Sequence, residues 1–236
     1  MARLDPHSYT DSDDGHITEM QLSLGVDFET KCLKGLVTLF LNRPSCGILH
    51  LDTKDLHIEK VRSEGADVQW TVGEKDKILG SCLTFALRKG AHEVSIAYKT
   101  SRDASALQWL TPLQTAGKKY PYLFSQCQAI HARSIVPVQD SPSIRFRYHA
   151  ELTVPKPLAA VMSAALTDQF DSPSHTTTYF FDMPQPIPAY LLALAVGNIA
   201  YKDVSPRSRV YAEPEMLEGA AWEFAEIESM IQAGEK

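Results

Sequence analysis

The sequence predicts a mainly β fold, built as a β-sandwich or as open, curved sheets. Short runs of alternating apolar and polar residues recur from residue 20 to about residue 199, and Gly, Asp, Lys and Ser separate them. Helical spacing of apolar residues begins only beyond residue 206. A chain of 236 residues with 44% hydrophobic residues is long and apolar enough to bury a core.

The first half of the chain contains the clearest hairpin. Met20 to Val26 alternates strictly between apolar and polar residues, and Gly35 to Leu41 is rich in β-branched and large apolar residues. The two runs are close enough in sequence to pair as antiparallel strands. Further strands are expected at Leu56 to Val61, Val68 to Val72, Cys82 to Leu87 and Glu93 to Tyr98.

The segment from Ser101 to Ser143 interrupts this rhythm, because four prolines lie among its polar and aromatic residues. We expect a long irregular excursion there, and such segments often carry function. Alternation returns from Ile144 to Val154, the most regular strand of the sequence. More strands are expected at Ala159 to Ala165, Thr176 to Phe181 and Tyr190 to Ile199, with a flexible loop near Asp171 to His175.

The last residues predict one amphipathic helix from about Pro214 to Ala233. Glu213, Pro214 and Glu215 resemble a helix start, since proline suits the first turn and acidic residues suit the positive end of the helix dipole. A mainly apolar stripe follows at three- and four-residue steps: Leu217, Ala221, Phe224, Glu228 and Ile231. Such a helix needs a partner for its stripe, so we expect it to belong to a following domain.

Charge, hydropathy and cysteine usage exclude several functional classes. The 23 basic and 29 acidic residues give a net charge of −6 without a basic stripe, so no nucleic-acid partner is expected. The first twenty residues are polar and acidic, which predicts a loose arm on a cytoplasmic protein without a signal peptide or a membrane partner. Cys32, Cys46, Cys82 and Cys127 form no CxxC pair, and we expect reduced thiols.

Two segments carry a family resemblance. Ser105 to Pro112 reads SALQWLTP, and Tyr122 to Ser143 reads YLFSQCQAIHARSIVPVQDSPS. Together they closely resemble the leukotriene A(4) hydrolase and aminopeptidase B branch of the gluzincin zinc aminopeptidases. Weaker likeness runs through LDTKDLHIEKV, ELTVPKPLAAVMSA and WEFAEIESM, so the resemblance covers the chain from about Met20 onward.

The resemblance implies a fold, a domain organisation and an activity. The family's amino-terminal domain is a saddle-shaped, largely antiparallel β-structure beside a thermolysin-like catalytic domain. Residues 1–206 would therefore form the amino-terminal β-domain, and residues 207–236 the start of a truncated catalytic domain. The complete protein would be a zinc aminopeptidase that removes amino-terminal residues from peptides, and the resemblance leaves open whether it also hydrolyses an epoxide lipid.

The resemblance also implies that zinc binds outside these residues. The family takes its zinc ligands from an HExxH helix and a later glutamate, and a GxMEN loop holds the substrate's amine. Neither motif is present: the one His-Glu pair, His92 and Glu93, is followed by Ile96 where the second histidine should stand. The surrounding alternation predicts a strand, which lacks the helix face that such ligands share. We expect zinc in the complete enzyme, and neither zinc nor catalysis in this segment alone.

The expected site is the loop Gln126-Cys127-Gln128-Ala129. By resemblance, Gln128 stands at the family's recognition position and contacts the first residue of a peptide substrate, while Gln126 and Ala129 line the same pocket. An amide side chain offers a donor and an acceptor to a peptide's amine and carbonyl. Without the resemblance, these glutamines would be interpreted as loop residues that hydrogen-bond nearby backbone.

Residues near this loop allow alternative interpretations. His131 and Arg133 would suit a catalytic pair, but their alternation with apolar residues favours a bracing role. Asp140 is expected to form a turn with its own backbone, and Cys127 to be an unreactive thiol. Trp109 and its aromatic neighbours fit peptide binding or simple packing.

Two functions of different classes remain. The first is the amino-terminal domain of a zinc aminopeptidase, partnered by the catalytic domain of the same chain and by a peptide substrate. The second is a free-standing β-domain that binds peptides or a protein partner without catalysis. A helix without a partner for its apolar stripe favours the first.

Overall fold

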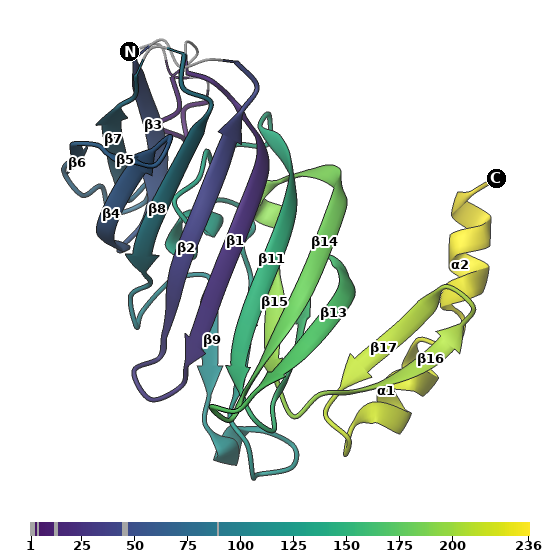
Figure 1. Ribbon diagram of the computed structural model, residues 1–236. Helices are drawn as coiled ribbons and strands as arrows, with labels where there is room; N and C mark the ends of the chain where they lie inside the picture. Colours follow the sequence, from purple (N-terminus) through teal and green to yellow (C-terminus); the bar gives the residue numbers. More distant parts are fainter. Residues whose placement is uncertain (1–2, 4, 12–13, 44–46, 89) are drawn as a thin grey trace.

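The computed structural model describes residues 3, 5–11, 14–43, 47–88 and 90–236. Strands dominate this part of the chain, and they form one large sheet, two smaller sheets and a separate hairpin (Figure 1). Two short helices close the sequence. The mainly β, largely antiparallel fold that the sequence predicts is confirmed.

Eight strands form the large sheet, in the order β13-β14-β11-β1-β2-β8-β4-β5. Their bounds are Ile17–Asp27 (β1), Cys32–Leu41 (β2), His57–Ser63 (β4), Ala66–Asp67 (β5), Glu93–Lys99 (β8), Arg145–Pro155 (β11), Ala165–Ser172 (β13) and Thr176–Pro188 (β14). Neighbours are antiparallel except β1 and β11, which run parallel. The predicted hairpin of β1 and β2 is present, and the most regular predicted strand, β11, lies beside it.

Two smaller sheets complete the β-domain. The four-stranded sheet has the order β12-β15-β10-β9, with bounds Ala159–Met162, Leu194–Gly197, Tyr122–Ser125 and Leu107–Leu110. The three-stranded sheet has the order β3-β7-β6, with bounds Ile48–Thr53, Ser81–Ala86 and Trp70–Val72. A single buried apolar cluster includes Leu24 of β1, Leu83 of β7 and Val196 of β15, so one core is shared by all three sheets.

The excursion between residues 101 and 143 builds part of the four-stranded sheet and is not wholly irregular. It contains β9 and β10, which pair with each other, and β10 also pairs with β15. Four-residue strands are too short to show a clear alternation, which explains why sequence periodicity missed them. Two 3-10 turns, Pro112–Gln114 (η1) and Ala132–Ser134 (η2), lie in the same segment.

A close contact in the core explains one glycine of β2. Gly35 pairs with Tyr98 of β8, and a Cβ atom at position 35 would overlap the phenol ring. The Tyr98 side chain is buried, and its hydroxyl has no hydrogen-bond partner among the described residues. Burial raises the pKa of this phenol, because the charged form loses its hydration. Glycine at position 35 therefore provides space for the ring.

Beyond Asn198 the chain leaves the three sheets. Strands β16 (Ala200–Ser205) and β17 (Ser208–Ala212) pair as a separate hairpin, and helices α1 (Leu217–Glu223) and α2 (Ile227–Gly234) follow (Figure 1). Helix α1 contacts both strands of the hairpin, and α2 contacts β16. The hairpin and the helices therefore form one small unit beside the β-domain.

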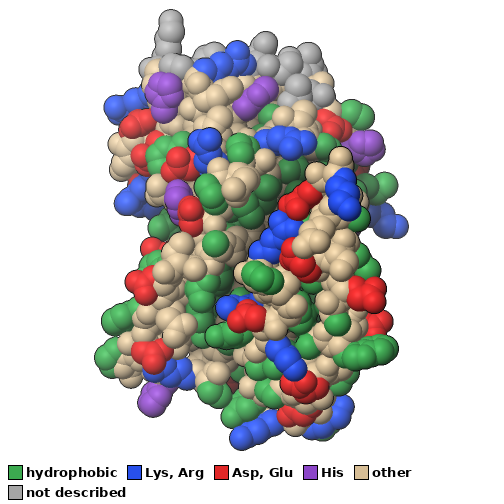
Figure 2. Space-filling view, turned by 90° about the vertical axis from the view of Figure 1, so that its right-hand side faces the viewer, with side chains coloured by type: hydrophobic (Ala, Val, Ile, Leu, Met, Phe, Trp, Pro, Cys, Tyr) green, Lys and Arg blue, Asp and Glu red, His purple; other side chains and the backbone are tan. Residues whose placement is uncertain are grey.

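The helical segment that the sequence predicts is divided into these two helices. Glu223 ends α1, and Glu226 lies directly before α2. Negative charge is unfavourable at the carboxyl end of a helix and favourable at the amino end, which is consistent with a break between these residues. Trp222 and Met230 are 77% and 63% exposed, and Figure 2 shows exposed hydrophobic side chains among charged ones on this side of the molecule.

The amino-terminal arm is docked, so the prediction of a loose segment was wrong for residues 5–11. It was also wrong for residues 14–20, where Asp14 is buried and β1 begins at Ile17. Ser8 and Thr10 are completely buried. The Ser8 hydroxyl donates to Oδ2 of Asp52 at 2.6 Å, and the Tyr9 N–H donates to Oδ1 of the same carboxylate at 2.7 Å. A polar segment can be held by buried polar partners, and the sequence does not show that such partners lie nearby.

Two smaller expectations concern membrane spans and thiols. Within the described ranges, no helix is both long enough and apolar enough to cross a membrane. Cys32, Cys82 and Cys127 are free thiols, and Cys46 lies outside the described residues.

Candidate functional site

The predicted recognition loop follows β10 of the four-stranded sheet. Gln126, Gln128 and Ala129 are exposed, whereas Cys127 between them is only 1% exposed. The cysteine therefore points into the protein while the three predicted site residues face outward. The structure confirms that Gln128 lies on an exposed loop, and its contact with a substrate stays a prediction.

The backbone of this loop is anchored at both ends. The Gln126 N–H donates to the Ala106 carbonyl at 2.8 Å, and the His131 N–H donates to the Cys127 carbonyl at 2.8 Å. Inside the loop, the Gln128 N–H donates to Oε1 of Gln126 at 3.1 Å, and the Gln128–Ala129 peptide bond is cis. No described residue hydrogen-bonds the Gln128 side-chain amide, which leaves its donor and acceptor groups available for a ligand.

His131 and its neighbours brace the loop, as the alternation predicts. Nδ1 of His131 lies 2.8 Å from the Ser105 hydroxyl. The His131 carbonyl accepts the Ser134 hydroxyl at 2.8 Å, and Ser134 Oγ in turn accepts the Ala106 N–H at 3.0 Å. Burial lowers the pKa of His131, and the positive charges of Lys54 and Arg133 lower it further. A neutral imidazole in this network is suited to structure.

Arg133 is the hub of a buried polar cluster below the loop. Its side chain is 0% exposed, and Nε donates to Oδ2 of Asp140 at 3.1 Å. The Nη1 group donates to the Leu79 carbonyl at 2.8 Å, and Nη2 donates to the His7 carbonyl at 2.8 Å. Nη1 also lies 3.5 Å from Oδ1 of Asp52. A buried guanidinium needs such saturation, so the cluster braces the fold.

Asp140 belongs to this cluster, and the prediction of a simple turn former was wrong. Its carboxylate accepts both the backbone N–H and Nε of Arg133, and its own N–H donates to Oδ2 of Asp52 at 2.9 Å. Burial raises the pKa of Asp140 to about 6; the attraction of Arg133 opposes this rise and the negative charge of Asp52 adds to it.

Cys127 lacks the environment of a reactive thiol. Burial raises its pKa to about 12, and the negative charge of Asp140 contributes to the rise. Because the thiolate is the nucleophilic form, this side chain is unreactive near neutral pH, as the sequence predicts.

The residues that the structure describes do not fit a zinc ion. No group of three or more His, Cys, Asp or Glu side chains in the described ranges could hold a metal. His92 is exposed just before β8, Glu93 begins that strand, and Ile96 points into the core. A catalytic zinc needs three protein ligands in fixed geometry, so no chemical step is assigned to zinc in this part of the chain.

Comparison with known proteins decides the family. The family model described as Peptidase M1 N-terminal domain matches residues 6–191. This chain belongs to that family. The match covers the arm from Pro6, the predicted recognition loop and every strand of the three sheets except β15, and it ends before the β16–β17 hairpin of this M1 domain.

Individual relatives resemble the M1 domain over nearly its whole length. The chain is 42% identical to a leukotriene A-4 hydrolase from Xenopus laevis, over 98% of this chain and 39% of that protein. It is 40% identical to leucine aminopeptidase 2 from Yarrowia lipolytica, over 98% of this chain and 36% of that protein. The structure of yeast leukotriene A4 hydrolase in complex with bestatin matches with a TM-score of 0.88 at 34% identity, over 98% of this chain and 36% of that one. The chain therefore spans less than two fifths of the length of these relatives.

Some of the aromatic residues near the loop of the M1 domain pack against other side chains of the fold. Trp109 packs edge-on against Phe28, with ring centroids 5.4 Å apart, and Tyr120 also packs against the core. Phe124 is 39% exposed and lies next to Tyr122, with centroids 6.5 Å apart. Of the group predicted from sequence, Phe124 is the exposed member, whereas Trp109, Tyr120 and Tyr122 are half-buried.

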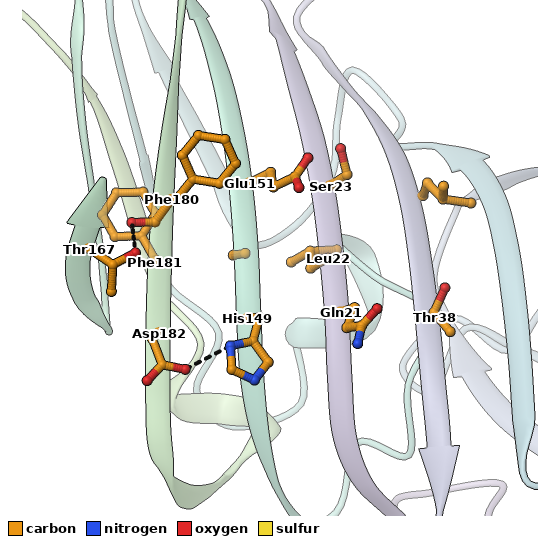
Figure 3. A pocket seen from close by; sticks show the side chains of 12 residues that line it. Gln21, Leu22, Ser23, Thr38, His149, Glu151, Thr167, Phe180, Phe181 and Asp182 are labelled. Carbon is orange, nitrogen blue, oxygen red and sulfur yellow. Dashed lines mark hydrogen bonds and ion pairs between the residues drawn. The ribbon is translucent and has the colours of Figure 1, made fainter. Parts of the chain in front are cut away.

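A hollow of about 630 Å³ lies on the outer face of the large sheet of the M1 domain (Figure 3). His149 of β11 and Asp182 of β14 pair across it, with Nδ1 and Oδ1 2.7 Å apart, and Gln21, Thr38 and Phe180 line it as well. None of the predicted site residues lines this hollow. It is an open, mixed polar surface and does not alter the choice of the loop as the candidate site.

Sequence reasoning missed the cluster that supports the loop. Asp52 is completely buried in β3, where it receives bonds from the arm and from Asp140. The one available signal was a carboxylate directly after Leu51 in the run ILHLDT, which periodicity treats as an interruption. Its partners are 44 and 88 residues away in sequence, so no local pattern could identify them.

Proposed function

We propose that this M1 domain is the substrate-recognising, amino-terminal part of a zinc aminopeptidase that removes amino-terminal residues from peptides. The loop of Gln126, Gln128 and Ala129 contacts the first residue of the peptide. The catalytic domain follows in the same chain and supplies the zinc. The observation that carries this proposal is an exposed pair of amide side chains on a loop whose backbone is anchored at both ends.

The chemistry of the loop suits the end of a peptide. A substrate's terminal amine needs an acceptor and its first carbonyl needs a donor, and the side-chain amide of Gln128 offers both. Oε1 of Gln126 already accepts the Gln128 N–H, and the NH2 group of Gln126 can donate to the substrate. An anchored loop loses little conformational freedom when a ligand binds, so more of the interaction energy is available for affinity.

The names of the relatives support the choice of substrate. Leucine aminopeptidase 2 from Yarrowia lipolytica and from two further fungi match at 34–40% identity, which favours peptides. The Xenopus leukotriene A-4 hydrolase raises a lipid epoxide as a second substrate class. The loop residues alone favour the peptide, so both substrate classes should be tested in the same assay.

The domain boundary also stays a proposal. The sequence places it near Pro206, but Pro206 lies in the turn between β16 and β17, which pair along their length. A boundary through a paired hairpin would separate two strands that satisfy each other's hydrogen bonds. We therefore place the start of the catalytic domain before Ala200, where the chain leaves the four-stranded sheet.

Substitution of Gln128 tests the recognition role. Gln128→Leu removes the donor and the acceptor at similar bulk, and in the complete enzyme we expect kcat/KM for an aminoacyl substrate to fall about ten- to a hundredfold, or about 1.5 to 3 kcal/mol. In the 236-residue chain the same change should shift Tm by no more than about 2 °C, as for other surface substitutions. Gln69→Leu is the matched control, because Gln69 is also exposed but lies just before β6 in the three-stranded sheet.

Three results would contradict the proposal. Normal peptidase kinetics in the Gln128→Leu enzyme would show that the loop does not recognise the substrate. A chain that fails to fold with Gln128→Leu, while Gln69→Leu folds normally, would show that the side chain is structural. A complete protein without any peptidase activity would instead favour a β-domain that binds peptides or proteins without catalysis.

A further inference from the structure

The docked arm contacts the same cluster that supports the recognition loop. Ser8 and Tyr9 donate to the two carboxylate oxygens of Asp52 at 2.6 and 2.7 Å. The carbonyl of His7 accepts Nη2 of Arg133 at 2.8 Å. Further along the cluster, the Ser141 hydroxyl donates to Oδ2 of Asp5 at 2.9 Å. The arm therefore supplies groups to a buried cluster that residues far away in sequence also complete.

Arg133 connects this cluster to the loop through the chain itself. It is the middle residue of η2, which follows the Gln126–Ala129 loop after two residues. Its backbone N–H donates to Asp140 at 3.2 Å, and its carbonyl accepts the Lys54 N–H at 2.8 Å. Both the main chain and the side chain of Arg133 are thus fixed, and η2 is held in one place.

The loop has two anchors, and both lead to η2. On one side, the Gln126 N–H donates to the carbonyl of Ala106, directly before β9, and the Ala106 N–H donates to the hydroxyl of Ser134 in η2 at 3.0 Å. On the other side, the Cys127 carbonyl is bonded to His131, the residue directly before η2. A shift of η2 would loosen both anchors, so the loop would become mobile while the large sheet stays folded.

We propose that residues 5–11 act as a strap that positions the Gln126–Ala129 loop through Arg133. Ser8 and Arg133 are positioning residues in this arrangement, since no described contact joins either side chain to the exposed amides of the loop. The importance of the strap for catalysis rests on the proposed recognition role of the loop. Its effect on the mobility of the loop does not.

The strap should influence substrate affinity more than turnover. When only a fraction of the molecules holds a loop in its binding geometry, the apparent dissociation constant rises by the reciprocal of that fraction. Once substrate is bound, the loop is ordered in every productive complex, so the chemical step proceeds at its usual rate. A free strap should therefore raise KM and leave kcat almost unchanged.

Hydrogen exchange of the 236-residue chain tests the strap directly. Removal of residues 1–11 should accelerate exchange at the N–H groups of Gln126, His131 and Ser134 about tenfold, while amides of the central strand β11 stay within about twofold of their original rates. Ser8→Ala, which removes one bond to Asp52, should give a smaller change at the same amides. Ser174→Ala, in the exposed turn between β13 and β14, is the matched control and should change nothing.

Addition of a synthetic peptide with residues 1–11 to the shortened chain should restore slow exchange at the loop. Unchanged exchange at the three loop amides would overturn the strap. Equal acceleration in the loop and in β11 would overturn it as well, because the arm would then stabilise the whole domain and not the loop.

The kinetic measurement separates this inference from the proposed function. In the complete enzyme, removal of residues 1–11 should raise KM about three- to tenfold and change kcat by less than about twofold. If KM is unchanged although Gln128→Leu has its expected effect, the strap does not position the loop for substrate. If exchange accelerates but Gln128→Leu is kinetically silent, the strap stands and the recognition role fails.

Discussion

The buried carboxyl of Asp140 predicts a pH dependence of stability with a definite sign. Burial raises its pKa from 3.8 to about 6, against the attraction of Arg133. The folded chain therefore binds this proton more tightly than the unfolded chain does. Where the folded state holds more protons, stability falls as pH rises. The contribution of Asp140 is greatest below about pH 4 and is lost as pH rises through about 6.

The size of this pH effect follows from the pKa shift of Asp140. A rise of about two pKa units corresponds to a total of about 3 kcal/mol in the free energy of unfolding, of which about 1 to 2 kcal/mol is lost between pH 5 and pH 8. Asp140→Asn keeps an oxygen acceptor for Arg133 but cannot ionise. For a chain of this size, 1 kcal/mol corresponds to about 2 to 4 °C in Tm. Between pH 5 and pH 8, the Tm of Asp140→Asn should therefore rise by about 4 °C relative to the Tm of the wild-type chain.

Thermal unfolding of both chains at pH 5, 6, 7 and 8 measures this difference. Other titrating groups are common to both chains and cancel in it. A difference that stays constant would show that Asp140 does not titrate in this range. A change in favour of the wild-type chain would show that the attraction of Arg133 outweighs burial, which would refute the reasoning.

Three further outcomes are expected of the 236-residue chain. After dialysis it should contain no stoichiometric zinc and cleave no aminoacyl chromogenic substrate, which metal analysis and a peptidase assay check, because its sequence has no HExxH motif and its described residues form no zinc ligand set. Gly35→Ala should lower the free energy of unfolding in urea by about 1 to 3 kcal/mol, since its methyl group overlaps the Tyr98 ring; Gly25→Ala in β1, where the nearest atom lies 3.9 Å away, should have little effect. Iodoacetamide at pH 8 should leave Cys127 unlabelled in the folded chain, because burial raises its pKa to about 12; rapid labelling, detected by mass spectrometry, would contradict that assignment.

The sequence by itself determined the class of fold and the position of the candidate loop. Strict alternation predicted β1 and β11, because a strand that covers a core on one face must place apolar side chains at every second position. The β-branched and large apolar residues of Gly35 to Leu41 predicted β2. The two segments that carry the family resemblance predicted the membership that the family model confirms. They also drew attention to Gln126, Gln128 and Ala129, and the structure places all three outward on one loop.

Only the tertiary structure decided what holds that loop. Asp52, Arg133 and the arm around Ser8 are far apart along the chain, and each is an unremarkable polar residue in its local sequence. Their partnership depends on the folded sheets bringing them into one buried place, where unpaired charges would be costly and paired ones are retained. The parallel contact of β1 with β11 is likewise a property of the assembled sheet, because the paired residues, such as Glu19 and Arg147, are 128 positions apart in sequence and meet only in the folded chain.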